Sequence, residues 1–541
     1  MSRSGDRAPG WEELLEQLAA RQHEARAMGG PEKLERQHRG DRLDARQRLE
    51  VLCDKGSFQE IGALVGSVAH GALPAAPADA IVGGLARIEG RPLVVAAEDF
   101  TVQGGSIGLG NHAKRVRLVG LALQERVPLV LLLEGAGERV TNALERYPHA
   151  PNDLQVMARL SGRVPTLAVV LGASAGHGAL TGLLADFVVM VEGASLFSAG
   201  PPVVAQALGE QVSKQELGGA ALHTRESGVA HNAVASEAEA LALVRAYLSY
   251  FPSSAWQRPP IDEAGPDREA RQLDDLLEII PTDPNRPYDM RAVIECVGDR
   301  GAFLEIQPHY GDSILTGLLR LGGWPVGIVA NQPAVQAGSI TREAAEKAAH
   351  FLELMDAFHF PVVFLADNPG IMAGSRAERA GTLRSAARMF AAQSRLRSPK
   401  LHVTLRKAYG FGSSLMAMNP FDGQTLTLAL PGSSLGAMPA EAGSDAVGAD
   451  PEERRRLAEA AASGTWKAAD ALSYDRIIDP RELRTALIEA LCATSARAAA
   501  APLPAAHPGI RPGTAGARLP GRALVLAPHT GREPQARDVG A

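Results

Sequence analysis

The amino-acid sequence predicts an α/β protein built from two copies of one domain. The first observation is a series of short, non-alternating apolar runs bounded by glycine or proline. This pattern is typical of strands that are buried on both faces, with helices between them. The second observation is a long internal repeat. The third is the length of 541 residues, 45% of them hydrophobic, since domains usually hold ~100–200 residues and two large cores can form.

The predicted elements follow one another in a simple order. Residues 11–28 form an amphipathic helix that ends at two glycines, a usual stop signal, and residues 44–53 form a second helix. Four buried strands come next, over residues 92–97, 127–133, 165–171 and 187–191. Residues 251–267 are rich in proline, serine and charge and are predicted to be a linker, after which the same pattern starts again.

The internal repeat is visible as aligned segments. Residues 92–107 (PLVVAAEDFTVQGGSI) lie over 325–340 (PVGIVANQPAVQAGSI) at an offset of 233. At an offset of 234, residues 164–178 (VPTLAVVLGASAGHG) lie over 398–412 (SPKLHVTLRKAYGFG). Several matches in the same order indicate a duplicated α/β domain, and the period is far too long for a solenoid.

These patterns predict three parts. We expect an N-terminal domain over residues 11–265, a C-terminal domain over 276–497, and a disordered tail over 498–541. The tail is rich in Ala, Pro, Gly and Arg and shows little hydrophobic periodicity.

Composition excludes several classes of function. The formal net charge is -6, and no basic blocks occur, which argues against nucleic acid as a partner. The three cysteines (Cys53, Cys296 and Cys492) lie far apart, which excludes a disulfide framework and favours a reducing cytoplasmic location. The longest aliphatic runs are far below the ~18 residues needed to span a bilayer, so we expect no membrane insertion.

Each copy contains a strand followed by a glycine-containing turn, over residues 172–178 and 406–412. Glycine lets the backbone approach a ligand closely and lets successive N–H groups point outward. Such a donor pair forms an oxyanion hole, which stabilises charge on a carbonyl oxygen. The alternative is a turn whose glycines only permit tight packing. The occurrence in both copies favours function, because two facing holes suit a reaction between two carbonyl compounds.

A series of motifs runs along both copies. In the first copy these are RQHRGDRLDARQRLEVLCDKGSFQEI (36–61), GGSIG (104–108), EGAGERV (134–140), SAGHG (174–178), FSAGPPVV (197–204) and ELGGAALHTRESGVAH (216–231). In the second they are PTDPNRPYDMRAVI (281–294), GIVANQP (327–333), DNPGIMAG (367–374) and RKAYG (406–410). With these motifs the sequence resembles the carboxyltransferase (β) subunits of biotin-dependent acyl-CoA carboxylases, such as the acetyl-, propionyl- and methylcrotonyl-CoA enzymes.

The resemblance implies two crotonase-type domains of the ClpP/crotonase superfamily and a homo-oligomer, most simply a hexamer. It implies that acyl-CoA binds the N-terminal domain of one subunit and biotin the C-terminal domain of another. The reaction moves CO2 from carboxybiotin to the α (or vinylogous) carbon of the acyl-CoA through an enolate, a step of fatty acid metabolism, and no metal is implied. The chain has no A/V-M-K-M biotin-attachment signal and no recognisable ATP-grasp segment. A biotin carboxylase and a biotin carboxyl carrier (α) subunit are therefore the expected partners.

The resemblance also assigns site residues. The first oxyanion hole is the N–H pair of Gly176 and His177, and the second is that of Phe411 and Gly412. The family usually has small residues at His177 and Phe411, and a side chain there is disfavoured if the turn demands a positive φ.

Four neighbours of the two holes are expected to bind substrate: Ala175, Gly410, Arg139 and Ser414. Ser414 is expected to shape the acyl pocket. Arg139 could hold a CoA phosphate or pair with a nearby carboxylate. Lys114 and Lys347, which are placed alike in the two copies, are expected to be solvated helix lysines.

Two other functions stay open at this point. Related subunits run the chemistry in reverse, as decarboxylases that move CO2 from an acyl-CoA to biotin. The chain could also be a weakly active structural subunit of a carboxylase complex, since His177 and Phe411 occupy the hole positions. Carboxylation assays with several acyl-CoAs separate the three.

Overall fold

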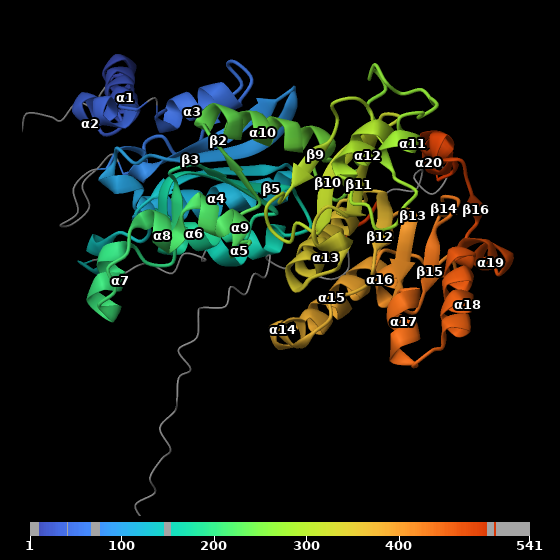
Figure 1. Ribbon diagram of the computed structural model, residues 1–541. Coiled ribbons are helices and arrows are strands. Elements are labelled where there is room, and N and C mark those ends of the chain that lie inside the picture. Colours follow the sequence, from blue (N-terminus) through green and yellow to red (C-terminus); the bar gives the residue numbers. More distant parts are fainter. Residues whose placement is uncertain (1–9, 41, 67–75, 145–152, 495–501, 505–541) are drawn as a thin grey trace, which may run out of the picture.

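Two eight-stranded sheets, one from each half of the chain, form the body of the protein (Figure 1). The computed structural model describes residues 10–40, 42–66, 76–144, 153–494 and 502–504. The strand order is β1-β2-β3-β4-β5-β6-β8 in the first sheet and β9-β10-β11-β12-β13-β14-β16 in the second; β7 pairs with β5, and β15 pairs with β13. The same order in both sheets confirms the duplicated α/β fold.

The strands of the first sheet are β1 (Gln59–Glu60), β2 (Ile81–Ile88), β3 (Arg91–Glu98), β4 (Leu129–Gly135), β5 (Thr166–Ala175), β6 (Phe187–Val191), β7 (Ser195–Phe197) and β8 (Asn232–Val234). Those of the second are β9 (Leu304–Ile306), β10 (Ile314–Leu321), β11 (Trp324–Asn331), β12 (Val362–Asn368), β13 (Lys400–Tyr409), β14 (Leu426–Ala429), β15 (Ser434–Gly436) and β16 (Arg476–Ile477). In each half the first three strands are antiparallel and the following ones are parallel.

Helices connect and cover the strands. The N-terminal half contains α1 (Trp11–Arg26), α2 (Pro31–His38), α3 (Ala45–Leu52), α4 (Leu109–Glu125), α5 (Asp153–Leu160), α6 (Gly176–Leu183), α7 (Pro201–Leu208), α8 (Lys214–Gly218), α9 (Ala220–Arg225) and α10 (Glu237–Tyr250). The C-terminal half contains α11 (Leu276–Ile279), α12 (Met290–Val297), α13 (Arg342–Ala357), α14 (Ser375–Ala380), α15 (Thr382–Ser394), α16 (Gly410–Leu415), α17 (Ala440–Ala446), α18 (Pro451–Ala462), α19 (Gly464–Asp470) and α20 (Leu483–Ala493). In the described residues, no helix is both long and apolar enough to span a bilayer.

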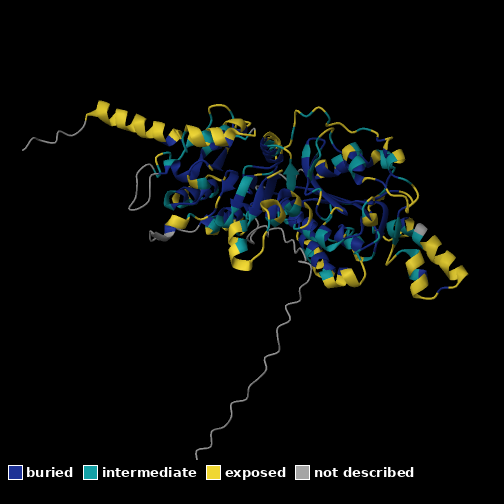
Figure 2. Ribbon diagram, turned by 60° about the vertical axis from the view of Figure 1, so that its left-hand side comes forward, coloured by how far each residue is buried: buried dark blue, intermediate teal, exposed yellow. Residues whose placement is uncertain are grey.

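The two halves share a core. Figure 2 shows the buried residues gathered around both sheets and the exposed ones on outlying helices. Tyr247 of α10 stacks on Phe251 with 4.4 Å between ring centroids, and Phe251 packs against Phe358 and Phe360 of the C-terminal half at 5.3 and 4.8 Å. The predicted boundaries at residues 265 and 276 stay a prediction. Apart from residues 502–504, the tail predicted over 498–541 lies outside the described residues.

Lys114 and Lys347 are not solvated, so the expectation for them was wrong. Both side chains are buried on helices that pack against a sheet, and each Nζ donates to backbone carbonyls: Lys114 to Ile81 and Ala78, Lys347 to Gln307. Burial lowers the pKa of Lys114 to about 8 and that of Lys347 to about 7. The apolar part of a lysine side chain fits a buried site much as a methionine does. Helical periodicity alone therefore does not show that these two lysines are buried.

We expect Lys347→Met to stabilise the protein near neutral pH. The unfolded chain keeps the lysine proton up to pH ~10.4, whereas the folded chain loses it near pH 7. Between these values the unfolded state binds more protons, so the free energy of unfolding of the wild type rises with pH. Denaturant titrations from pH 7 to 10 should show a gain of up to about 4 kcal/mol at pH 7.5 and a flatter pH profile. The exposed Lys33→Met is the control; equal profiles in both variants would contradict the prediction.

Candidate active site

Two equivalent strand-to-helix turns lie at the carboxyl ends of the central strands. β5 ends at Ala175, the N-cap of α6, and β13 ends at Tyr409, the N-cap of α16. The first N–H groups of a helix have no acceptor within the helix. The amides of Gly176 and His177, and those of Phe411 and Gly412, stand in these first turns and can donate outward.

The left-handed backbone of each turn falls on a glycine. Gly176 has φ +55° and Gly410 has φ +53°, while His177 and Phe411 are absent from the described residues with positive φ. The side chains of His177 and Phe411 therefore impose no backbone strain on the turns. A Cβ on Gly410 would also lie 2.8 Å from the Ala437 carbonyl oxygen, whereas a Cβ on Gly176 would meet the Ser198 carbonyl oxygen at 3.5 Å, an ordinary contact. Glycine is therefore required by its φ in both turns and by close packing in the second.

The second glycine of each G-x-G packs against a polar side chain at the end of another strand of the same sheet. A Cβ on Gly412 would lie 2.1 Å from Asn368 Oδ1 of β12, and a Cβ on Gly178 would lie 3.2 Å from Glu98 Oε1 of β3. Contacts below 3.0 Å force neighbours to move. The glycines thus bring both turns close to the polar ends of β3 and β12.

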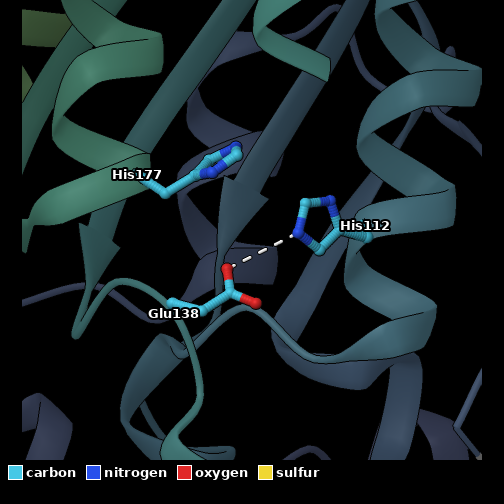
Figure 3. A group of neighbouring side chains, drawn as sticks. All are labelled: His112, Glu138 and His177. Atoms are coloured by element: carbon cyan, nitrogen blue, oxygen red, sulfur yellow. Dashed lines mark ion pairs between the residues drawn. The ribbon is translucent and has the colours of Figure 1, made fainter. Parts of the chain in front are cut away.

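The His177 imidazole belongs to a cluster of polar side chains beside the first turn (Figure 3). Its Nε2 lies 2.5 Å from Oδ1 of Asp153, the buried first residue of α5. Its ring meets the His112 ring edge-on at 5.1 Å, and His112 Nε2 lies 3.5 Å from Glu138 Oε2. Burial raises the pKa of the Asp153 carboxyl, but the hydrogen bond with His177 and the charge of Arg115 outweigh it, so this pKa is lowered.

Ion pairs support the first turn from inside. Glu134 at the end of β4 pairs with Arg42 and with Arg48, whose Nη1 is 2.8 Å from Glu134 Oε2. The same Arg48 holds Glu237 of α10 through Nε at 2.9 Å and Nη2 at 2.7 Å. This network ties α3 and α10 to the strand end beside the turn.

Asp367 at the end of β12 holds the equivalent place in the second half. It accepts from Arg406 Nε at 2.7 Å and from the Tyr288 hydroxyl at 2.9 Å. Burial raises the pKa of the Asp367 carboxyl in spite of Arg406. Both strand-end carboxylates are thus paired internally and hold the framework of the turns.

The substrate-binding candidates lie in different settings. Arg139 Nη2 pairs with Asp79 Oδ1 at 2.7 Å and with the Ser106 carbonyl oxygen at 2.9 Å, so its guanidinium has acceptors within the chain. Ser414 is half-buried on α16. An apolar hollow of about 250 Å³ lies beside the second turn, and Ser414 is not among its lining residues, which are Ile371, Leu383, Ala386, Ala387, Phe390, Phe411 and Leu415.

Sequence reasoning missed the wall of this hollow on α15 and the polar cluster around His177. Their members come from separate segments: His112 from α4, Glu138 from the loop after β4, and Asp153 from α5. The signal that could have found them is the parallel strand order, because loops after adjacent parallel strands meet at one edge of the sheet.

The duplicated α/β fold thus carries a strand-to-helix turn with the same G-x-G pattern at the end of the equivalent strand in each copy. The family model described as "Carboxyl transferase domain" matches residues 36–507. The chain belongs to this family, the carboxyltransferases of biotin-dependent acyl-CoA carboxylases, and the resemblance seen in the sequence is confirmed.

Relatives and solved structures agree with this assignment. The chain is 37% identical to the biotin-dependent acetyl-/propionyl-coenzyme A carboxylase beta5 subunit of Mycobacterium tuberculosis, over 83% of each chain. It is 34% identical to the methylmalonyl-CoA decarboxylase subunit alpha of Veillonella parvula, over 89% of this chain and 95% of that one. A crystal structure of transcarboxylase 12S, a hexamer with methylmalonyl-coenzyme A and methylmalonic acid bound, superposes with a TM-score of 0.84 at 32% identity and covers 93% of this chain and 100% of that one.

Proposed function

We propose that the chain is the carboxyltransferase subunit of an acyl-CoA carboxylase, which moves CO2 from carboxybiotin on a partner protein to the α carbon of an acyl-CoA. The observation that carries the proposal is the pair of equivalent turns at Gly176 and Gly410. Each turn has two consecutive amides in the first turn of a helix, and in each the residue with left-handed backbone conformation is a glycine.

The two donor pairs serve the two oxygens on which charge develops. The amides of Gly176 and His177 donate to the thioester oxygen of the acyl-CoA, which becomes negative as the α carbon loses its proton. The ureido nitrogen gives up CO2 to the α carbon and takes that proton, so the exchange balances without a further base. The amides of Phe411 and Gly412 donate to the ureido oxygen of the cosubstrate. Carboxybiotin supplies the CO2. The apolar hollow beside Phe411 suits an uncharged bicyclic ring.

In a homo-oligomer, most simply a hexamer, the first oxyanion hole of one subunit can face the second oxyanion hole of another subunit. Large apolar side chains are exposed beside both turns: Leu180 of α6 is 51% exposed, Phe411 76% and Leu383 of α15 65%. In the proposed oligomer a second subunit covers these side chains. The hexamer named for transcarboxylase 12S, at 32% identity, supports this assembly. Sedimentation that shows an active monomer would contradict it.

The direct test is an assay of the purified chain with a biotin carboxylase, a biotinylated carrier, ATP and bicarbonate. Acetyl-, propionyl- and longer acyl-CoAs are offered in turn, and incorporation of labelled bicarbonate into acid-stable product is measured. Incorporation with at least one acyl-CoA is expected. If none of the offered acyl-CoAs is carboxylated or decarboxylated faster in the presence of the chain, the chain is a structural subunit and the proposal fails.

A second candidate is the reverse reaction, decarboxylation of an acyl-CoA with transfer of CO2 to biotin. The 34% identity to the methylmalonyl-CoA decarboxylase subunit of Veillonella parvula favours it. The same two holes stabilise the same oxyanions in either direction. Two initial rates decide between the candidates: the rate of CO2 transfer from malonyl- or methylmalonyl-CoA to free biotin, and the rate of carboxylation of the acyl-CoAs in the forward direction.

Ser414 is expected to set the choice of acyl chain together with Phe411. Ser414→Asp and Ser414→Ile should change the ratio of kcat/KM for acetyl-, propionyl- and longer acyl-CoAs by at least about tenfold, because one methylene in an apolar pocket is worth about 10–200-fold. The half-buried Ser236, the N-cap of α10, gives the control Ser236→Asp, which keeps a capping oxygen. If both Ser414 variants keep the wild-type ratio, the acyl pocket lies elsewhere.

A further inference from the structure

The polar cluster beside the first hole has the composition of a metal site. His112, Glu138 and His177 each offer one ligand atom, and these atoms all lie within 4.8 Å of one another. Figure 3 shows the three side chains, from α4, the loop after β4 and the start of α6, converging on one space. Two imidazoles and one carboxylate are a ligand set that Zn²⁺ uses with the fourth position open.

Outer partners orient two of the three side chains. Asp153 Oδ1 lies 2.5 Å from His177 Nε2, which leaves the other ring nitrogen for an ion. Asn142 Nδ2 donates to Glu138 Oε1 at 2.7 Å and to the Ile107 carbonyl oxygen at 2.8 Å, so the second carboxylate oxygen of Glu138 faces His112. A ligating histidine backed by a carboxylate, and a ligating carboxylate held by a hydrogen bond, are the usual supports of a metal centre.

The charges around the cluster also fit a dication. Glu138 and Asp153 together carry two negative charges when ionised. The nearby arginines have other acceptors: Arg115 pairs with Glu98, and Arg139 pairs with Asp79. Asp153 is fully buried, and its Oδ2 has no hydrogen-bond partner among the described residues. A buried carboxylate oxygen without a partner is costly and signals an ion or water nearby.

We propose that His112, Glu138 and His177, with Asp153 behind His177, bind one divalent transition-metal ion of the zinc class beside the first oxyanion hole. A tetrahedral site with bonds of ~2.0–2.1 Å places its ligand atoms ~3.3 Å apart, so small side-chain rotations close the cluster around the ion. The side chains of Glu138 and His112 are 44% and 17% exposed, which gives the ion a path from solvent. Since the His177 amide belongs to the hole and its imidazole to the cluster, the ion fixes the side chain next to a proposed catalytic donor.

The test uses the full, tag-free chain, stripped with a chelator and titrated with Zn²⁺ alone. One equivalent per chain is expected by calorimetry and by elemental analysis after gel filtration. Co²⁺ in place of Zn²⁺ should give the intense visible absorption of a four-coordinate ion. His112→Ala and Glu138→Gln should each weaken Zn²⁺ binding at least tenfold, and Asp153→Asn should weaken it about 10–100-fold.

The matched control is His38→Ala. His38 also pairs with a carboxylate, Asp44, at 3.0 Å, but it lies outside the cluster. This variant should bind Zn²⁺ as the wild type does. Binding of less than one equivalent at tens of micromolar Zn²⁺ would overturn the proposal, and so would binding that His112→Ala and Glu138→Gln leave unchanged. None of these readouts depends on carboxyl transfer, so the metal site and the proposed activity fail separately.

Discussion

His177→Pro should lower kcat for carboxyl transfer by roughly 10²–10³-fold, the usual effect of removing one oxyanion-hole donor. Proline has no amide hydrogen, and it is tolerated in the first turn of a helix. His177 is the second residue of α6, so the helix can still form. Phe411→Pro at the same place in α16 should reduce kcat by a similar factor. Initial rates at saturating acyl-CoA measure both effects, and thermal midpoints show whether the variants are folded.

Glycine at the same positions separates the amide from the side chain. His177→Gly and Phe411→Gly remove the imidazole and the phenyl ring but keep the N–H group. The ratio of kcat between the glycine and proline variants at one position therefore reports the donor alone, and we expect roughly 10²-fold or more at each. Equal rates for the proline and glycine variants at a position would show that its amide stabilises no oxyanion.

Arg48→Met should cost about 3–5 kcal/mol of stability, because it leaves two buried carboxylates without their shared partner. The Arg48 side chain is only 1% exposed and contacts both Glu134 and Glu237 within 3.0 Å. A domain of 150–250 residues loses roughly 2–4 °C per kcal/mol, so a fall in the thermal midpoint of about 10 °C is expected in scanning calorimetry.

The control for this prediction is Arg36→Met. Arg36 pairs with Glu32 at 3.7 Å on α2, and the two side chains are 72% and 88% exposed. Exposed pairs contribute 0–1 kcal/mol, so the midpoint should hardly move. If Arg48→Met is no more destabilising than Arg36→Met, the buried network does not hold the strand end in place.

The framework of the fold was predictable because its strands are uniform. Buried parallel strands carry continuous apolar runs, and the strand expected at residues 187–191 is β6 (Phe187–Val191). The hairpin strands β2 and β10 were missed. β2 contains Gly83 and Gly84, which weaken any strand pattern, yet a Cβ on Gly84 would lie 1.9 Å from the Gln59 carbonyl oxygen of β1. The close packing of β1 on β2 therefore requires the same glycines that make β2 hard to recognise as a strand in the sequence.

The two turns could be found from sequence because each is one continuous segment that occurs twice. The surroundings of His177 could not, since His112, Glu138 and Asp153 are distant from it along the chain and meet only when the sheet forms. The same holds for Arg139. Its sequence context allowed a phosphate or a carboxylate as partner, and the fold places Asp79 2.7 Å away.

The confinement of the left-handed backbone to Gly176 and Gly410 separates what must stay constant in these turns from what can vary. In the proposed holes, the residue after each glycine would contribute only its main-chain N–H, so its side chain can differ between the two copies. At this position one copy has the imidazole of His177 and the other has the phenyl ring of Phe411. The same backbone turn therefore accommodates a polar cluster at His177 in one copy and an apolar wall at Phe411 in the other.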